Sequence, residues 1–239
     1  MRKYYSMVES DGILDLYVYG DITSYTWMDS DVSAYGIVQE LDGSTASQIN
    51  VYVNSYGGEV AEGLAIYNAL KRHHANVTTY CDGFACSAAS VVFMAGDERV
   101  MGDASLLMIH NAWSWTAGNA KELRKSADDL EKISESAAEA YRQVMTISND
   151  ELTALLDGES WIEPIKAMEY GFATSVASMR ESAAASMSTR RAVFEKMRAQ
   201  AKKEPEAEPP EPLELPKQKN KLREILTKGS QFFCTEKGE

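Results

Sequence analysis

The first 179 residues alternate between the hydrophobic pattern of strands and that of helices. Ile13–Tyr19 and Ile49–Val53 alternate at period two or run apolar, which predicts strands. Apolar residues recur at helical spacing between Val60 and Leu70, which predicts a helix with one buried face. Ser87–Ala95 is apolar on every side and predicts a buried helix. Further strands are expected at 77–80, 99–101 and 106–110, and further helices at 121–145, 150–156 and 164–170. This alternation predicts an α/β domain with right-handed crossovers.

Residues 180–239 have a different character. Five of the six prolines fall between Pro205 and Pro216, among glutamates, so this stretch is expected to be an extended, solvated linker. A charged helical segment is expected at 187–203 before it. After it, 222–233 is either a short amphipathic docking helix or a disordered end. We therefore expect a folded domain at 1–179 and a mostly disordered, Pro/Glu-rich extension at 180–239.

Charge and composition narrow the classes of function. The chain is 44% hydrophobic and 25% charged, as in an ordinary soluble globular protein, with a net charge of −12. Residues 180–239 carry 13 Lys/Arg against 10 Asp/Glu, and residues 1–179 carry 11 against 26. Such an acidic body would repel phosphate backbones, which argues against nucleic-acid binding. No apolar run reaches the length of a membrane span, and no signal peptide is expected.

Cysteine usage indicates the compartment. Cys81, Cys86 and Cys234 are too few and too scattered for a disulfide framework or a zinc site. We therefore expect a cytoplasmic protein that needs no metal. His73 and His74 lie at the polar end of a predicted helix, where capping the helix is expected rather than metal binding.

Two residues are candidates for nucleophilic catalysis. Ser87 opens the buried helix after a glycine-bearing turn, and His110 ends the apolar strand that precedes a Trp-rich loop. A serine nucleophile needs an adjacent base, and the end of a strand is where α/β domains present such groups. The structural alternatives are an N-cap role for Ser87 and a buried, hydrogen-bonded role for His110.

The other parts of a serine site also have candidates. The helix start supplies the N–H of Ala88 as one oxyanion donor, and the Gly57-Gly58 turn between a strand and a helix supplies a second donor site. The orienting carboxylate is Asp157 or Glu159, on a predicted loop; a solvated loop acid is the structural alternative.

Several motifs in order resemble the Clp protease proteolytic subunit (ClpP) family. The resemblance covers about residues 12–177 and is strongest to the phage-type branch of head maturation proteases. The motifs that carry it are Asn54-Ser55-Tyr56-Gly57-Gly58, the Ser87 turn, Met108-Ile109-His110, Glu159-Ser160-Trp161 and Glu169-Tyr170-Gly171-Phe172. The run from Ala65 to His73 is also similar to that branch.

Residue by residue, the resemblance implies a catalytic triad. It puts the nucleophile on Ser87, the base on His110 and the acid on Glu159, with Asp157 as the fallback. The oxyanion donors fall on the N–H groups of Gly58 and Ala88. Glu159 stands where housekeeping members have aspartate, and Tyr56 replaces a proline before the glycines. Cys86 is then a packing residue beside the nucleophile, or a thiol that makes the enzyme sensitive to alkylating agents.

The resemblance also implies fold, substrates and partners. It implies a ClpP/crotonase-like superhelix of strand–helix repeats, whose copies form stacked homo-oligomeric rings through the long 121–145 helix. The activity would be a serine endopeptidase without cofactors that cuts phage scaffold and capsid proteins during prohead maturation. The chain before Ile13 is short, so a Clp ATPase partner is not expected. The tail would be a scaffold-like extension or a self-cleaved sequence. The alternatives are a non-catalytic capsid scaffold derived from a protease, and a crotonase-type acyl-CoA enzyme.

Overall fold

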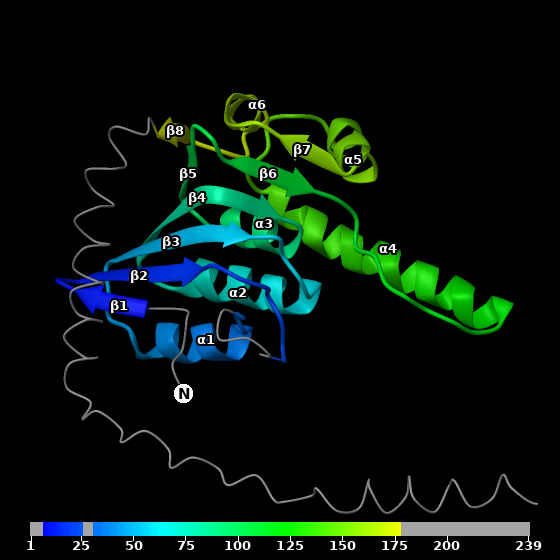
Figure 1. The fold of residues 1–239 in the computed structure, drawn as a ribbon, viewed down its shortest axis with the longest axis horizontal. Helices are drawn as coiled ribbons and strands as arrows, with labels where there is room; N and C mark the ends of the chain where they lie inside the picture. The colour runs from blue at the N-terminus through cyan, green and yellow to red at the C-terminus, as the bar shows by residue number, and fades with distance from the viewer. Residues whose placement is uncertain (1–6, 26–30, 178–239) are drawn as a thin grey trace, which may run out of the picture. The chain divides into compact units, whose positions relative to one another are not determined.

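A mixed eight-stranded sheet forms the centre of the molecule, which is described here by a computed structural model for residues 7–25 and 31–177. Its main path runs β1-β2-β3-β4-β5-β8, while β6 pairs with the distal half of β4 and with β7 (Figure 1). Pairing is parallel except between β1 and β2 and between β6 and β7. The strands are β1 (Met7–Ser10), β2 (Ile13–Val18), β3 (Gln48–Ser55), β4 (Asn76–Cys86), β5 (Glu98–Gly102), β6 (Leu106–Ile109), β7 (Ser160–Ile162) and β8 (Ser175–Ala177).

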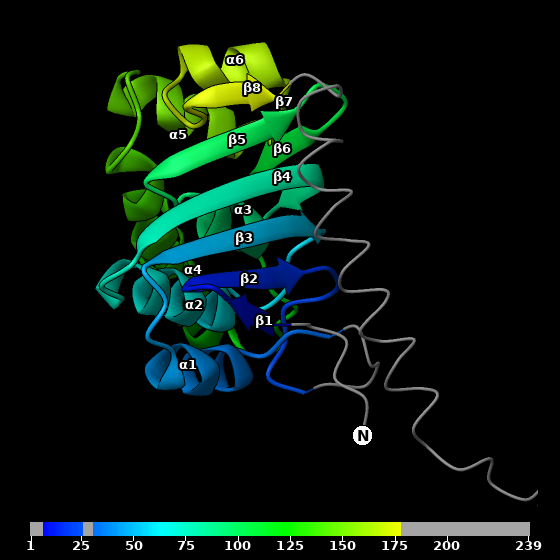
Figure 2. The ribbon, with the colours of Figure 1, turned by 90° about the vertical axis from the view of Figure 1, so that its left-hand side faces the viewer.

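Helices connect the parallel strands and pack against one face of the sheet (Figure 2). Their first turns are fixed by side-chain caps where the sequence offers one: Asn119 and Ser148 each form a capping box, with Glu122 and Glu151 respectively. The helices are α1 (Ala34–Gly43), α2 (Val60–Arg72), α3 (Ala88–Phe93), α4 (Ala120–Arg142), α5 (Asn149–Asp157) and α6 (Pro164–Glu169).

Alternating burial along the strands sets the core. On β2, Leu14, Leu16 and Val18 are buried, as period-two alternation requires when one sheet face carries helices. The opposite face carries a ladder of tyrosines from three neighbouring strands. The rings of Tyr17 and Tyr52 stack with centroids 4.8 Å apart, and those of Tyr52 and Tyr80 with centroids 4.9 Å apart.

Most predicted elements are present, with two informative differences. The strand expected at 77–80 continues to Cys86, and the helix expected from Ser87 begins only at Ala88 and ends at Phe93. Ser87 cannot belong to the helix because its φ is 53°, outside the right-handed helical region. The helix α1 and the short strands β1, β7 and β8 were not predicted. The predicted tail, 180–239, lies outside the described residues.

The helix α4 extends well beyond the sheet (Figure 1). Its buried residues, Ala138, Ala140 and Tyr141, all lie near its C-terminal end, and its N-terminal turns are exposed. In the described ranges no helix is long and apolar enough to cross a membrane.

Candidate active site

Ser87 lies at a strained junction between β4 and α3. Its φ of 53° and ψ of −126° are rarely adopted by a residue with a side chain, so surrounding contacts must hold it there. One of these is a hydrogen bond from the Ser87 N–H to the Met108 carbonyl, at 2.9 Å. The turn presents the Ser87 side chain at the first turn of α3.

His110 follows β6 and contacts the serine directly. Its Nε2 lies 2.8 Å from the Ser87 Oγ. The two residues, 23 positions apart, meet because β4 and β6 are parallel neighbours with Cys86 paired to Met108, so both chains leave the sheet at the same edge. The pair has the geometry of a nucleophile and its general base.

The buried hydroxyl groups of Tyr141 and Ser90 form a chain of hydrogen bonds that ends at the Ser87 carbonyl. The Ser90 Oγ donates to the Ser87 carbonyl at 2.6 Å, and the Tyr141 hydroxyl lies 2.7 Å from the Ser90 Oγ. Because the one Ser90 proton is used on the carbonyl, Tyr141 is the donor in the second bond. Burial raises the pKa of Tyr141 to about 12, which keeps that proton in place. These hydrogen bonds tie α4 to the Ser87 turn.

The two-glycine turn after β3 packs against the same junction. A Cβ at Gly57 would lie 2.7 Å from the Ser87 Cβ and 2.9 Å from the Ala88 nitrogen, so only glycine allows this approach. Gly58 forms a parallel bridge to Ile22, whose hydrogen bonds use the Gly57 carbonyl and the Glu59 N–H. In such a bridge the N–H of Gly58 itself is directed away from Ile22.

Ala88 supplies the other predicted donor. As the first residue of α3, it has no carbonyl of its own helix to bond with its N–H. The predicted oxyanion donors, Gly58 and Ala88, therefore lie on two segments that meet beside Ser87.

The two candidate acids occupy different positions. The antiparallel register of β6 and β7 ends with Ile109 paired to Ser160, so His110 and Glu159 each adjoin this last pair, and Glu159 lies in the turn before β7 with a φ of 46°. Asp157 is the last residue of α5, and its Oδ1 accepts a hydrogen bond from the Asn111 Nδ2 at 2.7 Å. Both acids are exposed, and within the described ranges neither is hydrogen-bonded to His110.

The thiol of Cys86, next to Ser87 in the chain, is shielded from solvent. Cys86 is 1% exposed, and burial raises its pKa to about 11. Burial likewise raises the pKa of Cys81 to about 12. A packing role therefore fits Cys86 better than the alternative of a reactive thiol, because the thiolate is the reactive species.

The two other histidines, His73 and His74, have a structural role at the end of α2. His73 is the C-cap of α2, its Nδ1 accepts from the Ala75 N–H at 3.1 Å, and its ring stacks on that of His74. Over residues 7–25 and 31–177, no group of three His, Cys, Asp or Glu residues is arranged to hold a metal ion.

Three residues that support the site were missed by sequence reasoning. Ser90 carries a weak signal, since a serine three residues into a helix can reach back to the carbonyl of its first turn. Asn111 adjoins His110 but has no distinctive pattern. Tyr141 is 54 residues from Ser87, and only the packing of α4 on α3 brings them together.

Comparison with known proteins shows the family to which the chain belongs. The sequence model of the Clp protease family matches residues 18–180, more than half of the chain. An ATP-dependent Clp protease proteolytic subunit from Deinococcus radiodurans is 32% identical over 139 residues, which are 57% of this chain and 68% of the relative.

Two further relatives carry the same name. The one from Bacteroides fragilis is 32% identical over 130 residues, covering 54% of this chain and 63% of the relative. The one from Chlorella vulgaris is 27% identical over 159 residues, covering 59% of this chain and 79% of the relative. The mixed α/β fold described above is consistent with a ClpP-like fold. The chain belongs to the Clp protease family.

Proposed function

We propose that this protein is a serine endopeptidase with Ser87 as nucleophile, His110 as base and Glu159 as the orienting acid. The observation that carries the proposal is the 2.8 Å contact between the Ser87 Oγ and the His110 Nε2, at a serine held in strained backbone geometry. The proposal also has the support of the family, whose proteolytic subunits are serine peptidases.

The mechanism is acyl transfer in two steps. His110 Nε2 takes the hydroxyl proton as the Ser87 Oγ attacks the substrate carbonyl carbon, and the N–H groups of Gly58 and Ala88 stabilise the oxyanion. His110 then gives the proton to the leaving amine, which departs as the acyl-enzyme forms. Water repeats the sequence and releases the acid. Glu159 stabilises the imidazolium and fixes the tautomer of His110.

Peptide hydrolysis by purified full-length protein tests this proposal. Ser87→Ala should abolish turnover of a fluorogenic peptide library, with a loss of about 10⁴-fold or more. Ser47→Ala is the matched control, because Ser47 is exposed and directly precedes β3, at the end of that strand away from the glycine turn. Turnover that persists in folded Ser87→Ala protein would contradict the proposal.

We further propose that the natural substrates are phage scaffold and capsid proteins, cut in the host cytoplasm during prohead maturation. The support is the sequence resemblance of the Ala65–His73 run and of Glu159-Ser160-Trp161 to the phage-type branch. Purified enzyme should cut such proteins at discrete sites and leave unrelated folded proteins intact. Cleavage of all of them alike would contradict this assignment.

We propose that copies of the chain assemble into rings, and that peptide hydrolysis needs no Clp ATPase. Leu123 and Ile133 on α4 are 42% and 40% exposed, and Trp113 and Trp115 before it are more so, which suits burial against another copy. The relatives are named as ATP-dependent, yet none of the steps above consumes a nucleotide. Native mass spectrometry should find a closed oligomer, and turnover of short peptides should be unchanged by ATP and a Clp ATPase.

Two rival functions use the same fold differently. A non-catalytic capsid scaffold would have no need of the Ser87–His110 contact, and a crotonase-type enzyme would use backbone donors on an acyl-CoA thioester without a serine–histidine pair. Peptide turnover that disappears in Ser87→Ala separates the peptidase from both.

A further inference from the structure

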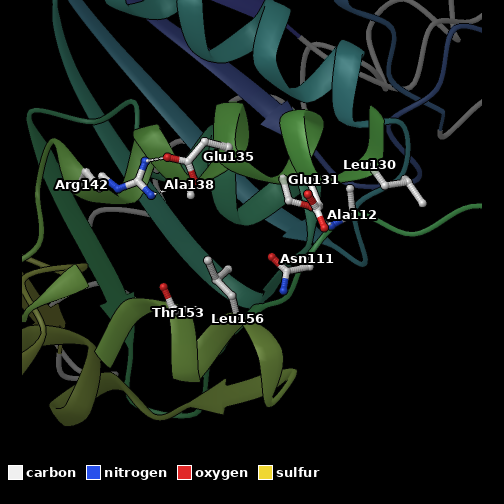
Figure 3. A pocket seen from close by; sticks show the side chains of 10 residues that line it. Asn111, Ala112, Leu130, Glu131, Glu135, Ala138, Arg142, Thr153 and Leu156 are labelled. Carbon is white, nitrogen blue, oxygen red and sulfur yellow. Dashed lines mark hydrogen bonds and ion pairs between the residues drawn. The ribbon is translucent and has the colours of Figure 1, made fainter. Parts of the chain in front are cut away.

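A pocket of about 350 Å³ lies between α4 and α5 (Figure 3). Asn111 and Ala112, which line it, directly follow His110. Consecutive Cα atoms are about 3.8 Å apart, so the Cα atom of Ala112 lies within about 8 Å of that of His110. Its volume suits one long side chain. A substrate held at Ser87 would therefore have a residue flanking the scissile bond within reach of it.

The segment that follows His110 is hydrogen-bonded to both walls of the pocket, α4 and α5. The Ala112 N–H donates to the Ser134 Oγ of α4 at 2.9 Å, and the Asn111 Nδ2 donates to the Asp157 Oδ1 at 2.7 Å. These bonds hold the pocket and His110 in one arrangement, so what binds in the pocket is positioned relative to the nucleophile.

The walls combine apolar stems with acidic ends. Leu130 and Ala138 of α4 and Leu156 of α5 supply apolar surface, and Glu131 and Glu135 supply carboxylates. Figure 3 shows the α4 side chains across the pocket from those of α5.

Only one of the two carboxylates, that of Glu135, is paired with a cation. Arg142, also in the lining, contacts both oxygens of Glu135, with Nη1–Oε1 at 2.8 Å and Nη2–Oε2 at 3.0 Å. In the described part of the chain, no ion pair or hydrogen bond engages Glu131. Arg142 also contacts Glu139, outside the lining, at 3.4 Å. The charged residues of the lining, Glu131, Glu135 and Arg142, therefore sum to one net negative charge.

We propose that this pocket receives a lysine or arginine side chain of the substrate, with Glu131 as its ionic partner; this inference rests on the proposed peptidase function. The apolar walls match the methylene stem of such a side chain, and Glu131 matches its cationic head. The residue flanking the scissile bond is thus basic. An acidic residue there is disfavoured by Glu131, and a short apolar one makes no contact with this exposed carboxylate.

The test measures selectivity on matched peptides that differ only at the residues flanking one cleavable bond. Wild-type protein should show a higher kcat/KM for Lys or Arg than for Leu or Glu. Glu131→Gln keeps the side-chain shape and should lower kcat/KM for the basic peptide by about tenfold, with little change for the Leu peptide. Glu131→Lys should move the preference toward Glu.

Asp128→Asn is the matched control, since Asp128 lies on the same exposed part of α4, outside this pocket, and its loss changes the net charge equally. A small uncharged fluorophosphonate, which does not reach the pocket, should label Ser87 equally fast in wild type and all three variants. If Ser87 is labelled but the wild type shows no preference for basic peptides, this inference is overturned and the peptidase proposal stands. The same holds if kcat/KM for the basic peptide falls equally in Glu131→Gln and Asp128→Asn. No labelling of wild type would overturn the peptidase itself and this inference with it.

Discussion

Gly58 shows how one missing Cβ shapes the site. Its φ is 145°, and a Cβ there would lie 2.1 Å from the Ile22 carbonyl oxygen, which is main chain and cannot swing away. We expect Gly58→Ala to displace the turn and lower kcat by about 10²-fold or more, as loss of an oxyanion donor does.

The control for this variant is Gly43→Ala, because a Cβ at Gly43 has open space around it. Steady-state kinetics and thermal melts of both variants make the comparison. Normal turnover in Gly58→Ala would contradict the assignment of this turn.

Among the described residues, Tyr141 is hydrogen-bonded to the Ser87 turn only through Ser90, so we expect it to be a positioning residue. Tyr141→Phe removes the donor to the Ser90 Oγ and should cost about 1 kcal/mol of stability, a fall in Tm of about 2–4 °C. It should also lower kcat several-fold at constant KM, because the Ser87 turn loosens while the substrate contacts stay.

Tyr35→Phe, at a tyrosine that is 73% exposed on α1, provides the control. A lower Tm with unchanged kcat would assign Tyr141 a purely structural role.

Cys86 sets an expectation for pH dependence. Because burial raises its pKa to about 11, the thiolate is scarce at pH 7.5 and grows tenfold with each pH unit up to that value. Iodoacetamide at pH 7.5 should leave activity unchanged over an hour, with peptide mass spectrometry finding no adduct on Cys86. Rapid inactivation with an adduct on Cys86, absent in Cys86→Ala, would contradict the buried-thiol interpretation.

At the scale of elements, the end of the β6–β7 ladder distinguishes the surroundings of the two acids. Glu159 and His110 adjoin its last pair, Ile109–Ser160, whereas the Asp157 carboxylate accepts a hydrogen bond from Asn111. We expect Glu159→Gln to lower kcat by about 10²–10⁴-fold. Asp157→Asn retains a carbonyl oxygen that can accept from Asn111, so it should stay near wild type. Side-by-side kinetics of the two isosteric variants test this, and the reverse order of losses would assign the acid to Asp157.

The elements that could be predicted are those with enough length to display a period. The strand β2 and the helix α2 follow directly from their hydrophobic patterns, and α4 was predicted as a long, charge-rich helix. The strands β7 and β8 have three residues each, too few for any alternation to be recognised. Because β7 could not be predicted, sequence patterns alone left Asp157 and Glu159 equivalent; only the resemblance favoured Glu159.

The candidate site, like the fold, could be predicted only in part. Ser87 and His110 stand out individually, as a serine at a helix start and a histidine at a strand end. Their contact depends on β6 pairing with the distal half of β4, which no local pattern encodes. The pocket around Glu131 was not foreseen, because it exists only where α4 and α5 face each other.

At the scale of the whole molecule, the charge of residues 1–179 and that of the proposed pocket have the same negative sign. Residues 1–179 carry 11 Lys/Arg against 26 Asp/Glu, and the pocket lined by Asn111 and Ala112 carries the unpaired carboxylate of Glu131. Long-range attraction and the local pocket would therefore both favour basic substrates, and the former should weaken with added salt.

The central claim is that Ser87 is an activated nucleophile. Intact-mass spectrometry of the full-length protein before and after a fluorophosphonate probe tests it most directly, with Ser87→Ala alongside. We predict one adduct per chain on the wild type and none on Ser87→Ala. A folded, assembled wild type that takes up no probe, or an adduct that persists in Ser87→Ala, would contradict the account.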